Sequence, residues 1–473
     1  MKNIYYNKAY SIIILIISIL NSKEIEIEEN EKLLFVWEHF RHGARDPYIK
    51  IDPKTWIDFI GVQWKSQGEL NSIGLRSHYL LGAATRKRYD NFLSKTFDCN
   101  EISIISTDSN RTIMSAMANL QGIYKNFSTP NLTYSQINNS IMRNFNETYQ
   151  IEINKKIDEL KDSYIQNGIG VMPIHLFNNY NLIFKLNDAG FCPGIKKYKD
   201  EAKNSEEVKK MVDEFYKYTN DTYGEYIFNF MNVSGVERPN YLWEYSDSYT
   251  NLYYICDAYI ADYISGREMA HIKETEINME EFYYHALKHS KMDTYYVEYG
   301  IPPTKAPYVA VSPMFRSIFN YMERRIYLNE QDSYDSINSS SPKYVIYSGH
   351  DSTVGAVDVF LEAEFNITPD DPEYTTSQYF ELWQNETGYY IKYLINQKEK
   401  AIYKFEEFKK MINEKTFSQE EVEEICLGKK EEKIKEENIF KKIFFIILSI
   451  GIVFLLLLIV LIILEIKKRK LYY

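Results

Sequence analysis

The sequence predicts an α/β fold with a mainly helical insertion, because three short strand-like runs flank a long helical stretch. The runs are rich in β-branched and aromatic residues and end in polar clusters: "KLLFVWEHF" (Lys32–Phe40), "EISIISTD" (Glu101–Asp108) and "KYVIYSGHD" (Lys343–Asp351). Helical patterns follow the second and third runs, from Asn110 and Ser352. A strand, a polar loop and a helix in this order form the βα unit of an α/β sheet.

A change of pattern distinguishes the middle of the chain. From about residue 125 to 308 it consists of helical stretches rich in tyrosine, lysine and glutamate, without an obvious strand. We interpret 125–308 as a mainly helical cap inserted between two parts of the α/β domain, 31–124 and 309–426. Residues 427–442 would then form a stem after the domain.

Both ends of the chain predict a secretory route. Residues 1–22 contain the short apolar core "SIIILIISIL" (Ser11–Leu20) and are typical of a cleaved signal peptide. An uncleaved anchor is the alternative, although this core is short for a bilayer span. Near the other end, Ile443–Leu464 is a run of 22 residues without a charge, close to the ~20 needed to cross the hydrocarbon core.

The tail 465–473 orients this predicted transmembrane helix. It carries the basic stretch Lys467–Lys470, and basic residues stay on the cytoplasmic side. We therefore expect a single-pass type I membrane protein whose main domain is lumenal or extracellular, in a lysosome-like vesicle or at the cell surface. A buried core helix is disfavoured by the length of the run, and a lipid-anchor signal by the basic tail.

The segment between these ends, 23–440, is strongly acidic. Its net charge is −18, from 55 basic residues less the eight outside it and 66 acidic residues less Glu465. Such a surface repels nucleic acid, and it would lose self-repulsion in an acidic compartment. Ten N-x-S/T sequons in this segment suit a glycosylated ectodomain. They begin at Asn110, Asn126, Asn131, Asn138, Asn146, Asn220, Asn232, Asn338, Asn366 and Asn385.

Four cysteines, Cys99, Cys192, Cys256 and Cys426, lie too far apart in sequence for a zinc or redox motif. In an oxidising lumen we expect them to form one or two disulfides. Spacing alone does not choose among the three possible pairings.

Cationic and imidazole side chains gather where the three predicted strands end. If the strands are neighbours, three arginines, two histidines and one carboxylate converge on one pocket. These six residues are Arg41, His42, Arg45, Arg111, His350 and Asp351. Arginine forks match phosphate oxygens bidentately, and helix N-termini add their dipoles.

The residue types in this set suit phosphoryl chemistry. Neighbouring cations lower the pKa of a histidine, so that His42 or His350 could stay neutral and nucleophilic in mild acid. A protonated Asp351 beside it could give a proton to a departing alkoxide. The residues alone therefore predict a phosphate or phosphoester site. The alternative is a set of surface salt bridges and two loop histidines bonded to the backbone.

At these residues the chain resembles the histidine acid phosphatases. "RHGARDP" matches their R-H-G-x-R-x-P signature, and "SGHDST" matches their second, H-D signature. "WKSQGELNSIGLRSHYLLGAATRKRY" and "STDSNRTIMSAMANLQGIY" resemble the tracts between the two. The resemblance runs in order from about Leu33 to Cys426.

The resemblance implies a role for each candidate residue. His42 would be the nucleophile that becomes a phosphohistidine, and Asp351 the acid that protonates the leaving group. The phosphoryl oxygens would be held by Arg41, Arg45, Arg111 and His350. The implied fold is the phosphoglycerate mutase-like α/β sandwich with a helical cap, and no metal or other cofactor is implied, because the arginines supply the charge stabilisation.

A few positions depart from the family pattern. Asn71 stands where threonine is usual, and the sequon at Asn110 lies so close to Arg111 that we expect it to be unmodified. The resemblance favours a Cys192–Cys426 disulfide. The usual partner position of Cys256 is Ser377 here, so Cys256 pairs with Cys99 or stays free.

The combined expectation is a membrane-anchored acid phosphatase that acts on phosphomonoesters and does not bind nucleic acid. A phytase-type or lysophosphatidate-type specificity would keep the chemistry and change only the cap. A mutase of the wider superfamily is disfavoured by the signal and membrane segments. A non-catalytic receptor or adhesion ectodomain would need neither His42 nor Asp351. A homodimer is possible, but the sequence selects neither an oligomeric state nor a physiological substrate.

Overall fold

The structure is a computed structural model that describes eleven stretches of the chain. They are 31–47, 68–125, 131–140, 156, 159–162, 172–176, 192–233, 248–266, 278–331, 341–427 and 461–463. The predicted signal peptide, stem and tail lie outside them, as does the predicted transmembrane run except for its residues 461–463. Across the described stretches, no helix is both long enough and apolar enough to cross a membrane.

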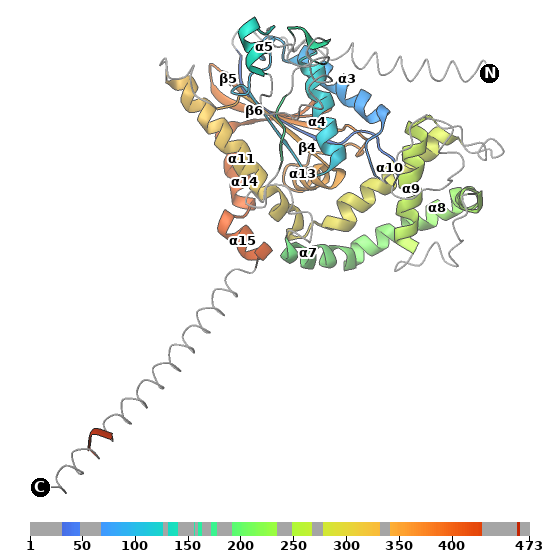
Figure 1. Ribbon diagram of the computed structural model, residues 1–473. Helices are drawn as coiled ribbons and strands as arrows, with labels where there is room; N and C mark the ends of the chain where they lie inside the picture. Colours follow the sequence, from blue (N-terminus) through green and yellow to red (C-terminus); the bar gives the residue numbers. More distant parts are fainter. Residues whose placement is uncertain are drawn as a thin grey trace, which may run out of the picture.

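A mixed β-sheet forms the centre of the described structure (Figure 1). Its strands are β1 (Lys32–Arg41), β2 (Ile102–Ser106), β3 (His175–Leu176), β4 (Tyr344–Gly349), β5 (Ser377–Asn385), β6 (Gly388–Ile395) and β7 (Lys398–Lys404). Their order across the sheet is β3-β2-β4-β1-β5-β6-β7. The first four are parallel to one another, whereas β5, β6 and β7 add in antiparallel pairs. The predicted α/β class is confirmed.

The three strands expected from the sequence are neighbours. β4 lies between β1 and β2 and runs parallel to both. Arg41 pairs with Gly349, and Ser348 pairs with Ser106, so the carboxyl ends of the three strands lie at one edge of the sheet. The polar clusters that follow these strands therefore meet, as the sequence requires for a common site.

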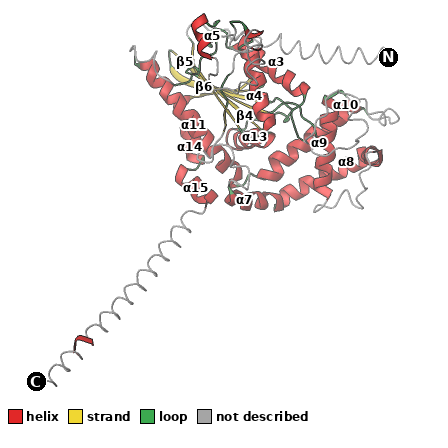
Figure 2. Cartoon of the chain, in the orientation of Figure 1, coloured by secondary structure: helices red, strands yellow, loops and turns green. Residues whose placement is uncertain are grey.

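Both faces of the sheet are buried because helices cover each of them (Figure 2). Along β1 successive side chains alternate: Val36 and Phe40 pack on the side of α3 (Ser72–Arg88) and α4 (Asn110–Ile123). Phe35 and Trp37 pack in the opposite core. That core contains α11 (Lys305–Glu330), α13 (Asp351–Phe365) and α14 (Phe405–Lys415). A strand that is buried on both faces has an almost continuous run of apolar residues, and the run "LLFVW" in β1 fits this pattern.

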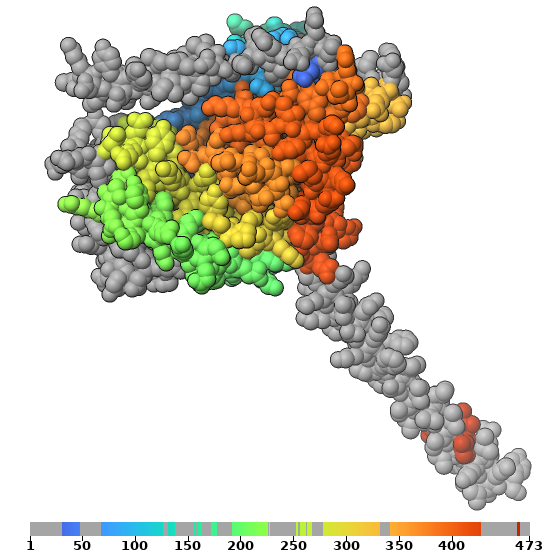
Figure 3. All heavy atoms as spheres, turned by 180° about the vertical axis from the view of Figure 1, so that it is seen from behind, coloured from blue at the N-terminus to red at the C-terminus, as the bar shows by residue number. Residues whose placement is uncertain are grey.

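A helical unit with its own apolar core adjoins the sheet domain. It comprises α8 (Glu206–Val233), α9 (Ser248–Ile264), α10 (Met279–Lys291) and the π-helix η2 (Met292–Val297). Figure 3 shows its green and yellow residues beside the orange and red residues of the C-terminal part of the core. Three further described helices are α5 (Tyr134–Ser140), α7 (Pro193–Asn204) and α15 (Gln419–Leu427).

The cysteines follow the pairing that the resemblance favours. A disulfide joins Cys192, at the start of α7, to Cys426 in α15. Cys256 is buried in the core of the helical unit and Cys99 is exposed, and both are free. Of the two possibilities for Cys256, the structure therefore has the free thiol.

Two features differ from the expected helical insertion. β3 falls inside 125–308, where the sequence showed no obvious strand, and pairs with β2 over only two residues, too few to give a periodic signal. The proposed boundary between 308 and 309 lies inside α11, whose Ala306 and Val309 belong to the same core. The division into cap and catalytic domain remains a prediction.

Candidate active site

The site begins where β1 ends. Arg41 is the last residue of β1, and its N–H donates to the carbonyl oxygen of Thr376 at 2.9 Å. The next N–H, of His42, donates to the carbonyl oxygen of Gly349 at 2.9 Å. The start of the loop that carries His42 is thus attached to the last residue of β4 and to the residue before β5.

Two glycines allow this loop to lie against the first turn of α3. A Cβ atom on Gly43 would come within 2.5 Å of the Gly74 carbonyl oxygen, and one on Gly74 within 2.1 Å of the Ala44 carbonyl oxygen. A side chain at either position would therefore displace the loop. Asn71 caps α3 by accepting hydrogen bonds from the N–H groups of Ile73 and Gly74. Asparagine serves as N-cap as well as the usual threonine does, so this departure is conservative.

The His42 side chain is buried and has a defined tautomer. Its Nδ1 lies 2.9 Å from the Gly43 carbonyl oxygen, which can only accept, so Nδ1 carries the proton. Nε2 of the neutral ring is then the nitrogen with a lone pair. Burial first, and then the charges of Arg41 and Arg111, hold the pKa of His42 well below its ordinary value. His42 therefore stays neutral in mild acid, as we expected for a histidine among these arginines.

His350 is fixed by hydrogen bonds at both ring nitrogens. Arg111 Nη2 donates to its Nδ1 at 3.3 Å, since a guanidinium cannot accept, and its Nε2 therefore donates to Thr107 Oγ1 at 2.9 Å. Burial and the charge of Arg111 lower the pKa of His350, against the opposing charge of Asp351. The His350 and His42 ring centroids are 5.6 Å apart. Arg111 and His350, which are far apart in sequence, thus meet beside His42.

Arg41 is held from three sides by the α/β core. Its Nη2 lies 2.8 Å from Asp351 Oδ2, in an ion pair with both side chains largely buried. Its Nη1 donates to the Pro372 carbonyl oxygen, and its Cζ lies 4.5 Å from the ring centroid of Tyr374. A guanidinium held in this way is oriented before any ligand binds.

Asp351 opens α13, and its ionisation differs from what we expected. Its Oδ1 accepts from the N–H of Ser352 at 2.8 Å. Burial raises the pKa of this carboxyl, but Arg41 and Arg45 lower it more, so the pKa lies below its ordinary value. Asp351 is therefore ionised in the ligand-free protein, and not protonated as we expected.

Arg45 is held by the helical unit. Its Nη2 and Nη1 lie 2.7 Å and 3.2 Å from the two carboxylate oxygens of Asp257, in α9. Both side chains are buried, and the pair is bidentate. One of the three predicted phosphate-binding arginines is thus oriented by a residue of the predicted cap.

All six predicted site residues lie at this edge of the sheet. They contact one another in pairs, Arg41 with Asp351, Arg111 with His350 and His350 with His42, while Arg45 acts on His42 by its charge. Sequence reasoning missed Asp257, Thr107 and Tyr374. Thr107 stood in the polar cluster after β2, but nothing in the sequence marked the other two. No group of three or more histidine, cysteine, aspartate or glutamate side chains in the described stretches is placed to hold a metal ion.

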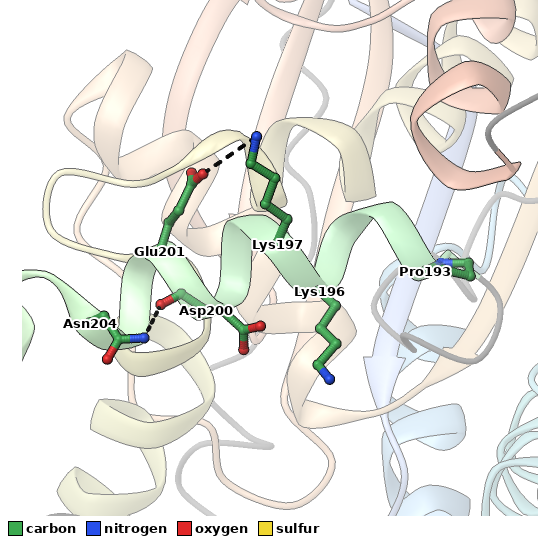
Figure 4. Close-up of a pocket in the computed structure, with 6 residues that line it drawn as sticks. All are labelled: Pro193, Lys196, Lys197, Asp200, Glu201 and Asn204. Carbon is green, nitrogen blue, oxygen red and sulfur yellow. Dashed lines mark hydrogen bonds and ion pairs between the residues drawn. The ribbon is translucent and has the colours of Figure 1, made fainter. Parts of the chain in front are cut away.

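A separate pocket lies on the surface of α7 and contains none of these residues (Figure 4). It is lined by Pro193, Lys196, Lys197, Asp200, Glu201 and Asn204. Lys197 pairs with Glu201, and the Asn204 amide donates to the Asp200 carbonyl oxygen within the same helix. These polar groups contact one another within α7, and we assign no binding site to this pocket.

Comparisons with known proteins identify the family of the chain. A family model described as histidine phosphatase superfamily (branch 2) matches residues 32–396. Lysosomal acid phosphatase of Xenopus laevis is 32% identical over 129 residues, which are 26% of this chain and 29% of that protein. Human prostatic acid phosphatase is 23% identical over 368 residues, covering 76% of this chain and 77% of that protein.

Solved structures show the same fold at low identity. The Hafnia alvei phytase in complex with myo-inositol hexakis sulphate has a TM-score of 0.51 and 13% sequence identity, covering 82% of this chain and 98% of that one. This likeness concerns the fold alone. The family model, the long alignment and the meeting of both signature motifs at one sheet edge lead to one conclusion: the chain belongs to the histidine phosphatase superfamily (branch 2).

Proposed function

We propose that the protein hydrolyses phosphate monoesters through a phosphohistidine at His42, without a metal ion. The observation that carries this proposal is the neutral His42 ring, with its Nε2 lone pair available and three arginines around it. The arginines supply the positive charge that stabilises a phosphoryl group in transfer. Acid phosphatases among the relatives support the same activity.

In the first step a bond forms between His42 Nε2 and phosphorus, and the bond from phosphorus to the ester oxygen breaks. The departing alkoxide takes up a proton and leaves as an alcohol. In the second step water attacks the phosphohistidine, inorganic phosphate leaves, and the Nε2 lone pair is restored. We assign both proton transfers to Asp351, whose carboxylate pairs with Arg41. It gives a proton to the leaving oxygen in the first step and takes one from the attacking water in the second.

The proton reaches Asp351 with the substrate. The second pKa of a phosphate monoester is about 6, so below that pH the ester is a monoanion that carries a proton. A phosphoryl group beside Asp351 also raises the pKa of this carboxylate by like charge. The ester therefore protonates Asp351 on binding, and Asp351 passes the proton to the leaving oxygen.

Turnover by the purified protein on a panel of phosphomonoesters, including phytate and a lysophosphatidate, tests the proposal. We expect hydrolysis that is strongest below about pH 6, where the ester carries the proton, and that chelator does not reduce. Loss of activity in chelator with recovery in magnesium would contradict the arginine-only chemistry. A preference for phytate would identify the phytase-type alternative.

We also propose that the catalytic domain is lumenal or extracellular and anchored by Ile443–Leu464. The acidic surface, the sequons and the Cys192–Cys426 disulfide support an oxidising compartment. A chain that ends at Glu437 should be secreted as a soluble glycoprotein. Its recovery as an integral membrane protein would indicate an uncleaved N-terminal anchor instead.

A further inference from the structure

The loop between α13 and β5 brings Tyr374 to the nucleophile. The Tyr374 ring centroid is 5.9 Å from that of His42 and 4.5 Å from Arg41 Cζ. On its other side the ring packs against the core of the helical unit. Tyr374 therefore lies where the loop of β1, the C-terminal part of the α/β core and the helical unit meet.

Two buried donors at this place make no hydrogen bond. The Tyr374 hydroxyl has no hydrogen-bond partner in the described stretches, and neither has Arg41 Nε, although both atoms are buried. The charged groups that act most on this hydroxyl are Arg45 and Asp257. Buried polar groups are almost always paired, so two unpaired donors beside one nucleophile indicate a ligand that pairs them.

The residue after Tyr374 is strained, which is an independent observation. Thr375 has a φ of 71°, a conformation that a β-branched residue rarely adopts. Its N–H donates to the His42 carbonyl oxygen at 3.3 Å, and its Oγ1 donates to Ser77 Oγ at 3.2 Å. Such strain persists where surrounding contacts impose it, and it clusters at functional sites. Here it fixes the loop that presents Tyr374.

We propose that Tyr374 is a further binding residue of the phosphoryl site, whose hydroxyl donates a hydrogen bond to a phosphoryl oxygen held at His42. Arg41 Nε donates to the same phosphoryl group. The inference rests on the proposed function, and it adds a neutral donor to the arginines and His350.

The chemistry of the phenol suits this role. Burial raises the pKa of Tyr374 to about 12, against the opposing charge of Arg45, so the hydroxyl keeps its proton throughout the acidic range. It can donate to a phosphoryl oxygen both before and after the phosphohistidine forms. The proton stays on the phenol, so Tyr374 acts by binding and orientation and not as the acid.

A packing role is the competing explanation, and two variants separate it from a donor role. Tyr374→Phe removes only the hydroxyl and keeps the ring against Arg41, whereas Tyr374→Ala removes both. Tyr124→Phe is the matched control, because Tyr124 is also a buried tyrosine whose hydroxyl makes no hydrogen bond in the described stretches, but it caps α4 beside Phe97.

The measurements are kcat/KM on one phosphomonoester and the inhibition constant of inorganic phosphate. We expect Tyr374→Phe to lower kcat/KM and to raise the inhibition constant by about 10- to 100-fold, the range for a hydrogen bond to a charged group. We expect Tyr124→Phe to match the wild type. If Tyr374→Phe kept the wild-type kcat/KM and inhibition constant while Tyr374→Ala lost activity, the donor role would be overturned. Packing of the ring would then be the role of Tyr374.

Phosphate binding can also be measured without turnover, which tests the role of Tyr374 separately from the proposed function. Inorganic phosphate should raise the melting temperature of the wild type, because it binds only the folded state, and raise that of Tyr374→Phe less at the same concentration. This shift does not require turnover. A wild type without phosphatase activity would remove the proposed function, whereas equal phosphate shifts in both proteins would remove the role of Tyr374.

Discussion

The two arginines of the loop after β1 are held by two different regions of the molecule. Arg41 is fixed by the α/β core, through Asp351 and the Pro372 carbonyl oxygen. Arg45 is fixed by the helical unit, through a bidentate pair with Asp257. The two cations lie four residues apart, yet their partners come from α13 and α9.

The two arginine partners differ in their proposed roles: Asp351 takes part in the reaction, and Asp257 only orients an arginine. The partner of Arg41 is a carboxylate that the proposed mechanism uses for proton transfer, so the pair belongs to the reacting groups. The partner of Arg45 has no step in that mechanism and acts only by orienting the guanidinium. The helical unit would therefore contribute to the proposed phosphate site by orienting Arg45, and variants of Asp351 and Asp257 should lose activity in different ways.

The largest expected effect separates the buried histidines of the two regions. His42→Ala should lower turnover by about four orders of magnitude or more, because no phosphohistidine forms without the imidazole. His285→Gln is the matched control, since His285 is also a buried histidine, but it lies in α10 and contacts Thr219 in α8. Rates on one aryl phosphate measure both, and normal turnover by His42→Ala would remove the mechanism.

The next effect distinguishes the two carboxylates that pair with arginines. Asp351→Asn should lower kcat/KM on an alkyl phosphate by about 10²- to 10⁴-fold, because an amide cannot give the proton that an alkoxide needs. A nitrophenyl phosphate should lose far less, since nitrophenolate departs without protonation.

Asp257→Asn is the control for this prediction, because it also removes an arginine partner but no proton donor. It should affect both esters by the same factor. If Asp351→Asn also gave equal losses, the role of Asp351 would be limited to orienting Arg41 or to accepting from the Ser352 N–H at the start of α13.

Asp257→Asn should itself reveal the positioning role of the helical unit. Removal of one partner of a buried ion pair leaves Arg45 without its carboxylate, which costs about 3 kcal/mol of unfolding free energy. We expect kcat/KM to fall by about tenfold for all substrates, as Arg45 loses its orientation. Urea unfolding at neutral pH and the two ester assays measure these effects. An unchanged free energy of unfolding would show that the Arg45–Asp257 pair does not stabilise the contact between the α/β core and the helical unit.

The smallest effect concerns the helical unit alone. Burial lowers the pKa of His285 to about 4, whereas the unfolded chain has an ordinary value near 6.5. As pH falls, the unfolded state therefore binds a proton at His285 before the folded state does. The free energy of unfolding decreases as pH falls from 6.5 towards 4. At pH 5 this amounts to about 2 kcal/mol of unfolding free energy. Between pH 7 and pH 5 the free energy of unfolding should therefore fall by about that much less in His285→Gln than in the wild type. An equal fall in both proteins would contradict the lowered pKa of His285.

Much of the site could be predicted because its residues follow strands. "RHGAR" and "SGHD" stand directly after β1 and β4, and the adjacent, parallel course of β1, β4 and β2 is confirmed. The family expected from these motifs is confirmed by the family model, and the Cys192–Cys426 disulfide is present. The roles of the six residues, the signal peptide, the membrane span and the cap boundaries remain predictions.

The sequence by itself determined the class of fold, the family and the six side chains that gather at one edge of the sheet, because strand ends in a parallel sheet bring local motifs together there. Only the tertiary structure decided how those groups are held and protonated. Asp257 and Tyr374 reach the site through packing between distant segments, which leaves no periodic or local signal in the chain. The ionised state of Asp351 likewise depends on the charges of Arg41 and Arg45 around it, because the surroundings shift the pKa that the residue type sets, and only the fold supplies those surroundings.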